Sequence, residues 1–265
     1  IDLTSYQSFR DATEAFQPDV IVHTAAYTDV NGCETYPDRA KSLNIDSAAN
    51  VAHVATELEA QLVHISTDHL FDGTEPWRTE DDAPKPLNVY AVTKLAGELA
   101  VVANCPDALV IRTNFYGWGS PLKASLSDWV LEGLRGNRRL SMFEDSFFNP
   151  ISINDLAELI VEMIGRRATG IYNIAGRDRL SKYSFALQLA ETFGYLTENI
   201  EQKRASEQQT VVVRPDDLSI SCDKLERLIG RPVPTVAEGL SKLWVLGKDG
   251  WPEKLRRATA TTLCE

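Results

Sequence analysis

An α/β fold with a doubly wound parallel sheet is predicted for this chain from three observations. Short apolar runs alternate with stretches of helical periodicity along much of the sequence. The apolar run of residues 63–65 ends abruptly in Ser66, Thr67 and Asp68, as a buried strand does at the carboxyl edge of a sheet. Tyr90 and Lys94 follow at a spacing that puts a phenol and an ammonium on one helix face. The pattern therefore predicts a site at that edge.

The first half of the chain is predicted to alternate helix and strand. A helix capped by Thr4 or Ser5 runs to about Phe16, and Pro18 separates it from a continuous apolar strand. The spacing of small and apolar residues predicts a long helix from Pro37 to Ala60. The further predicted elements are strands over 20–24, 62–65 and 108–113 and a helix over 90–102.

The second half is less regular, and a smaller lobe is expected there. Helices are predicted over 126–135, 155–164, 183–193 and 235–243, the second of them capped by Ser152 or Asn154, with a strand over 170–175. The tail after Trp251 is rich in Thr and Ala and is expected to be disordered. We predict a Rossmann-like cofactor domain in residues 1–117 and 151–175 and a substrate-binding lobe in residues 118–150 and 176–265.

Composition narrows the possible partners and compartments. The chain has 265 residues and is 43% hydrophobic, which is enough for one large core. A formal net charge of -11 argues against a nucleic-acid partner. The four cysteines are widely separated, so neither a zinc site nor a disulfide framework is predicted. No apolar run has the length of a membrane span, and no signal peptide opens the sequence, so a cytoplasmic protein without a membrane partner is expected.

The polar residues around the predicted sheet edge suit proton transfer. An unperturbed tyrosine has a pKa of about 10, and we expect the ammonium of Lys94 to lower the pKa of Tyr90. Ser66 or Thr67 can donate a hydrogen bond to a substrate carbonyl oxygen, and Asp68 can orient those hydroxyls or act as a second acid. Together these groups would polarise a carbonyl and protonate the alkoxide that forms when a hydride arrives.

Other catalytic motifs are not found. The sequence contains neither the H-E-x-x-H helix motif of zinc proteases nor the G-x-S-x-G nucleophile elbow, so metal catalysis and hydrolysis lack support. His69 lies between Asp68 and apolar residues, which is more typical of a packed loop residue than of a catalyst.

The motifs themselves resemble a known family. The runs from Ser66 to Gly73, from Pro86 to Tyr90 and from Lys94 to Glu98 resemble the extended short-chain dehydrogenase/reductases, most closely the dTDP-4-dehydrorhamnose reductases. The resemblance extends over most of the chain, through residues 18–28, 112–117 and 214–217. It implies reduction of a keto-sugar nucleotide by NADPH or NADH.

The resemblance also implies roles for individual residues. Tyr90 would be the proton donor, and Lys94 would also bond the nicotinamide ribose. Cofactor contacts are expected from Asp2, Leu3, Ala25, Ala26, Tyr27, Tyr90, Lys94 and Asn114. Substrate contacts are expected from Ser66, Thr67, Asp68, Phe115 and Asn149, and no metal ligand is expected.

The chain departs from the family pattern at three places. His69 stands where the family usually has Tyr, and Asn114–Phe115 replaces the usual Ser-Trp pair, which would reduce stacking near the sugar. The glycine-rich turn that holds the pyrophosphate at a helix N-terminus is not among these residues. We therefore expect the 265 residues alone to bind NADPH or NADH no better than about millimolar, and an added strand, glycine turn and helix to restore micromolar binding.

Two alternatives remain open at this point. One is a regulatory or binding protein on the same fold, as in the regulatory beta subunit of methionine adenosyltransferase, which resembles this chain over a similar length. The other is a sugar-nucleotide epimerase or dehydratase that retains the Tyr and Lys. NADPH consumption with a keto-sugar nucleotide separates these readings. A homodimer is a further possibility that the sequence leaves open.

Overall fold

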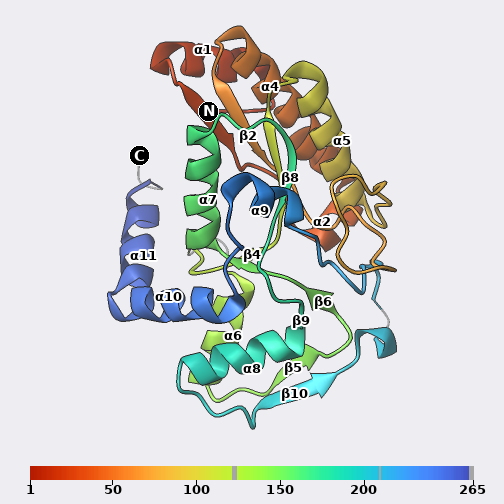
Figure 1. The fold of residues 1–265 in the computed structure, drawn as a ribbon, viewed down its shortest axis with the longest axis vertical. Helices are drawn as coiled ribbons and strands as arrows, with labels where there is room; N and C mark the ends of the chain where they lie inside the picture. The colour runs from red at the N-terminus through yellow and green to blue at the C-terminus, as the bar shows by residue number, and fades with distance from the viewer. Residues whose placement is uncertain (121–123, 209, 263–265) are drawn as a thin grey trace. The chain divides into compact units, whose positions relative to one another are not determined.

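The chain divides into two compact units. A computed structural model describes residues 1–120, 124–208 and 210–262 (Figure 1). The first unit comprises residues 1–113, 160–174 and 209–229, and the second comprises residues 114–159, 175–208 and 230–265.

A four-stranded parallel sheet forms the centre of the first unit. Its strands run in the order β1 (Val20–His23), β2 (Gln61–Ile65), β3 (Leu109–Thr113) and β8 (Gly170–Ile174). Each neighbouring pair is parallel, and the register sets His23 beside His64. Parallel pairing brings the carboxyl ends of all four strands to one edge, which confirms the predicted fold class.

Helices cover this sheet, and most lie where the periodicity predicts them. They are α1 (Tyr6–Phe16), α2 (Val30–Thr35), α3 (Pro37–Lys41), α4 (Ser47–Glu57) and α5 (Val89–Asn104). Ser5 caps α1 by accepting from the backbone N–H of Ser8. The long predicted helix is interrupted by a π-helical turn over Ser42–Asp46, against which α5 packs so closely that a Cβ on Gly97 would overlap the Asn44 carbonyl.

The core of the first unit lies between the sheet and these helices. Helices α4 and α5 lie side by side over it (Figure 1). The buried residues that fill this layer are Ala48, Val51, Ala52, Ala55, Leu62, Val101, Cys105, Ala108 and Val110. Several of these residues are alanines, whose small side chains allow the helices to pack closely on the strands.

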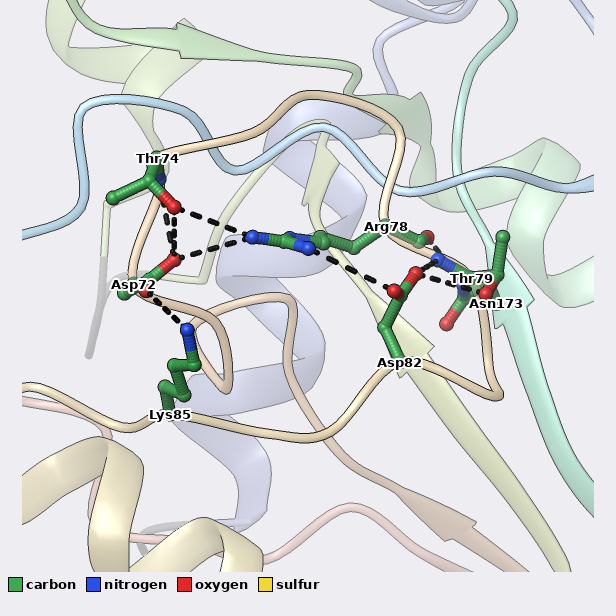
Figure 2. A network of polar contacts seen from close by, with 7 residues as sticks. All are labelled: Asp72, Thr74, Arg78, Thr79, Asp82, Lys85 and Asn173. Carbon is green, nitrogen blue, oxygen red and sulfur yellow. Dashed lines mark hydrogen bonds and ion pairs between the residues drawn. The ribbon is translucent and has the colours of Figure 1, made fainter.

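A polar network ties the loop after β2 to the rest of the first unit. Figure 2 shows Arg78 between the carboxylates of Asp72 and Asp82. Hydrogen bonds from Thr74 are the main reason that the pKa of Asp72 falls to about 2. The Asn173 side chain, on β8, donates to the carbonyls of Arg78 and Ser221. Residues 209–229, which the sequence analysis placed in the substrate-binding lobe, therefore pack within the first unit.

Gly73 makes that packing possible, and we expect Gly73→Ala to destabilise the protein. Its φ is +76°, and an added Cβ would lie 2.7 Å from the backbone nitrogen of Asp216. Strain and overpacking together should lower the free energy of unfolding by about 2–4 kcal/mol. Gly194→Ala is the matched control, because φ is +72° there and nothing lies within 4 Å of the added carbon. It should cost only about 1 kcal/mol, and equal losses in denaturant titrations would contradict the packing argument.

The second unit joins short strands to helices. Strand β5 (Leu140–Phe143) pairs parallel with β10 (Ile200–Lys203), β4 (Phe115–Tyr116) with β7 (Ile151–Ser152), and β6 (Phe147–Phe148) antiparallel with β9 (Leu180–Ser181). The remaining helices of the described residues are α6 (Leu126–Arg135), α7 (Ile153–Gly165), α8 (Lys182–Thr192), α9 (Asp223–Ile229), α10 (Val236–Lys248) and α11 (Trp251–Thr262), with a 3-10 turn at Ala205–Glu207. Ser152 caps α7 by accepting from the N–H of Asp155.

The prediction of a disordered tail after Trp251 was wrong for the part of the tail that the structure describes. Residues 251–262 form α11, which packs against α10. Pro252 stands in its first turn, and the Glu, Lys, Leu, Arg and Ala residues that follow favour helix strongly enough to outweigh the threonines.

The described ranges contain neither a membrane-spanning helix nor a cluster of metal-ligating side chains. Within residues 1–120, 124–208 and 210–262, no helix has both the length and the apolar character that a membrane crossing needs. The same ranges contain no group of three or more His, Cys, Asp or Glu side chains that could bind a metal ion. Cys33, Cys105 and Cys222 are buried thiols, and Cys264 lies outside the described residues.

Candidate active site

The carboxyl end of β2 and the first turns of α5 meet in the first unit. Ser66, Thr67 and Asp68 follow β2 directly, and all three are buried. Asn88 caps α5 by accepting from the Ala91 N–H at 2.9 Å, which fixes the turn that carries Tyr90. The Thr67 hydroxyl donates to Asp68 at 3.2 Å and also hydrogen-bonds with the Tyr90 phenol. The predicted hydroxyl, carboxylate and phenol are therefore neighbours.

The prediction that Lys94 lowers the pKa of Tyr90 was wrong. Tyr90 is only 8% exposed, and burial raises its pKa to about 12. The hydrogen bond with Thr67 acts against this rise, whereas the charge of Asp68 adds to it. Desolvation dominates because the phenolate would lie in an apolar layer, so the phenol stays protonated at neutral pH.

Lys94 is directed toward the strand rather than toward the phenol. Its Nζ donates to the Ile65 carbonyl at 2.8 Å. Burial lowers the pKa of Lys94 to about 8, although the carboxylate of Glu98 acts in the opposite direction. At pH 7 most Lys94 side chains therefore remain charged, and the ammonium is fixed at the end of β2.

A buried ion pair that was not predicted from the sequence supports this site. Arg112 on β3 and Glu98 on α5 are almost fully buried, and the Arg112 Nε donates to Glu98 at 3.2 Å. Ser66 donates to the same carboxylate at 2.9 Å. The Ser66 hydroxyl therefore takes part in the internal network rather than pointing to a substrate. The sequence hint of this ion pair was Arg112, a charged residue that follows a run of apolar residues in the predicted strand.

Asn44 is a second buried residue that sequence reasoning missed. Its Oδ1 accepts from the Tyr27 N–H at 2.7 Å, and its Nδ2 donates to Thr93 at 3.0 Å. It thus joins the segment after β1 to the helix that carries Lys94. Ala25 and Ala26, which precede Tyr27 in that segment, offer small side chains at the end of β1, and Ala25 is exposed.

The other predicted contacts are spread over both units. In the first unit Asp2 is exposed and accepts from Thr4, while Leu3 packs against the core. In the second unit the Asn114 carbonyl accepts from Ile151 at 3.0 Å, and the ring of Phe115 is half exposed on β4. Asn149 is buried there and donates to the Gly176 carbonyl at 2.9 Å. The cofactor and substrate roles of these residues remain predictions.

His69 packs beside the phenol. Its ring meets that of Tyr90 edge to face, with 5.6 Å between the centroids, and its Nε2 lies 4.0 Å from the Asp68 carboxylate. This placement agrees with the packed loop residue that the sequence favoured.

We expect Lys94→Met to lower turnover and to weaken binding of the nicotinamide cofactor, because the Lys94 ammonium is predicted both to support catalysis and to bond the nicotinamide ribose. In the wild type, turnover should decline above about pH 8 as Lys94 loses its proton. This decline should be absent from the residual activity of the variant. Calorimetric titration with NADPH and a pH profile of kcat check the two parts. Unchanged cofactor affinity in the variant would rule out the ribose contact.

Comparisons with known proteins place these residues in a family context. The chain is 31% identical to a dTDP-4-dehydrorhamnose reductase of Sinorhizobium fredii, with 93% of this chain and 86% of that protein covered. It is 31% identical to mouse methionine adenosyltransferase 2 subunit beta, with 92% of this chain and 75% of that protein covered.

Solved structures agree with this result. The crystal structure of dTDP-4-dehydrorhamnose reductase from Bacillus anthracis in complex with NADP has a TM-score of 0.87 at 26% identity, covering 92% of this chain and 86% of that one. The sequence matches the RmlD substrate binding domain over residues 1–245. The chain therefore belongs to the RmlD substrate binding domain family.

Proposed function

We propose that this protein is an NAD(P)H-dependent oxidoreductase of the short-chain dehydrogenase/reductase type that reduces the keto group of a nucleotide-linked sugar. The observation that carries the proposal is the buried group of Thr67, Tyr90 and Lys94 at the carboxyl end of β2. The reductase relatives, one of them crystallised with NADP, support the assignment. Such a reaction belongs in the cytoplasm, where nucleotide sugars and reduced thiols occur together.

The described residues fit the nicotinamide half of such a cofactor. An ammonium has three N–H donors, and the contact with the Ile65 carbonyl uses one of them, so Lys94 can also donate to a ribose hydroxyl. The small side chains of Ala25 and Ala26 leave room for a flat ring near the end of β1. When bound, the cofactor supplies the hydride.

Tyr90 supplies the proton. In the proposed reaction the carbonyl carbon gains a hydride, and the carbonyl oxygen takes the proton from Tyr90 Oη. A general acid must be protonated before it reacts, and the raised pKa of Tyr90, about 12, ensures this at neutral pH. The charge of Asp68 opposes release of this proton, whereas the hydrogen bond with Thr67 stabilises the phenolate that release leaves behind.

The test is cofactor consumption together with product analysis. The protein is incubated with saturating NADPH or NADH and dTDP-4-dehydrorhamnose, with UDP- and GDP-linked keto sugars as comparisons. We expect one cofactor to be oxidised for each sugar reduced, and deuteride at C4 of the cofactor to appear on the former carbonyl carbon. Cofactor oxidation with none of these sugars, by a protein that circular dichroism shows to be folded, would contradict the proposal.

A regulatory role is the second candidate, because the identity with methionine adenosyltransferase 2 subunit beta equals that with the reductase. In that case NADPH should bind without being consumed. An epimerase or dehydratase would change the sugar with no net oxidation of added NADPH, so the same assay distinguishes all three functions.

A further inference from the structure

Two histidines form a buried pair beneath the candidate site. His23 ends β1, and His64 lies beside it near the end of β2. Their Nδ1 atoms are 2.9 Å apart, and the two side chains are only 4% and 1% exposed. Neither Nε2 has a hydrogen-bond partner among the described residues. A buried nitrogen without a partner is unfavourable, so this arrangement calls for an explanation beyond packing.

The contact between the two Nδ1 atoms determines the tautomers. One Nδ1 must carry a hydrogen and the other a lone pair, because two N–H groups or two lone pairs would repel at this distance. One imidazole is therefore the Nδ1–H tautomer, and the other carries its hydrogen on Nε2. One added proton would preserve this hydrogen bond, whereas a second would break it. The pair thus behaves as a single-proton acceptor.

Lys94 is the charged group that faces this pair. Burial first, and then the charge of Lys94, lowers the pKa of His23 to about 4 and holds the pKa of His64 well below its usual value. Glu98, one turn beyond Lys94 on α5, is ion-paired with Arg112 on β3. Asn44 and Ser47, the buried polar residues of the π turn and the start of α4, do not titrate. A proton on the pair would therefore act chiefly on Lys94.

We propose that His23 and His64 are positioning residues for Lys94. Their neutral hydrogen-bonded pair holds the ends of β1 and β2 in register, so that the Ile65 carbonyl meets the ammonium and the segment 24–27 keeps its place. Uptake of one proton by the pair puts a second positive charge into the same buried layer, which repels the ammonium of Lys94, displaces it from the Ile65 carbonyl and lowers activity in acid. This inference builds on the catalytic role proposed for Lys94, but its first tests need no substrate.

Nitrogen-15 NMR of the histidine rings tests the pair in the unmodified protein. The chain has four histidines, so single substitutions assign every signal. We expect one buried ring in the Nδ1–H form, one in the Nε2–H form, and neither titrating near the ordinary histidine pKa of about 6.5. Finding the same tautomer in both rings of the wild-type protein, or ordinary titration of both, would overturn the proposal.

The coupling to Lys94 is tested in a variant that cannot take up the proton. The Lys94 Nζ signal, assigned with Lys94→Met, should shift when the pair takes up its proton in the wild type. This shift should be lost in the double variant His23→Asn, His64→Gln. His53→Gln is the control, because His53 is exposed on α4 and pairs with Glu57. A Lys94 signal that responds identically in all three proteins would overturn the coupling.

Activity then separates this inference from the proposed function. If the protein is a reductase, the acid midpoint of kcat should fall by about one pH unit in the double variant and stay in place in His53→Gln. An unchanged midpoint in an active, folded double variant would overturn the inference and leave the reductase intact. If the Lys94 signal follows the pair but no keto sugar is reduced, the proposed function fails and the inference stands.

Discussion

Tyr90→Phe should lower kcat by about 100-fold to 10,000-fold, the range that general acid catalysis supplies. The change removes the hydroxyl that we propose as the proton donor and leaves the ring in place. The edge-to-face contact with His69 needs only the ring, so the fold should persist. Steady-state NADPH oxidation, with circular dichroism to confirm folding, measures the effect.

Tyr6→Phe is the matched control for this experiment. It also deletes a tyrosine hydroxyl from the first unit, one that donates to Glu57 at 2.7 Å. That hydroxyl is exposed and belongs to none of the predicted site residues, so kcat should stay near the wild-type value. If Tyr90→Phe kept turnover within about threefold of wild type, general acid catalysis by Tyr90 would be excluded.

The sequence predicted the sheet and its long helices because their signals are local. An apolar run of four or five residues between breakers identifies a strand such as β2, and helical spacing identifies α5. The short elements were missed for the opposite reason. Strands β5 and β10 are four residues each and exist through pairing between segments far apart in the chain. Helix α2 is too short to show an apolar period.

The same distinction applies to the site. The positions of Tyr90, Lys94 and Thr67 were predictable because each is set by a single element, whereas their catalytic roles remain predictions. The pKa of Tyr90 was not, because it depends on how far the fold buries the phenol. Asn44 and Glu98 act through contacts with other elements, which periodicity does not reveal.

Arg112→Met should lower the free energy of unfolding by about 3–5 kcal/mol, which is what breaking a buried ion pair typically costs. The loss arises mainly because Glu98 would keep a buried negative charge without its partner. Adding Glu98→Gln should recover most of the stability, because the double variant leaves no uncompensated charge. Denaturant titrations of both variants and the wild type measure this difference.

Arg139→Met is the control, because its ion pair with Glu201 is exposed and should contribute only about 0–1 kcal/mol. If both single substitutions lowered the free energy of unfolding by similar amounts, burial of the ion pair would contribute little to stability.

The Arg112 variant has a second consequence at the site. The unshared charge of Glu98 should act more strongly on Lys94, whose pKa it already raises, so the decline of kcat above about pH 8 should move to higher pH. If the decline of kcat at high pH does not move, the ion pair stabilises the fold without changing the pKa of Lys94.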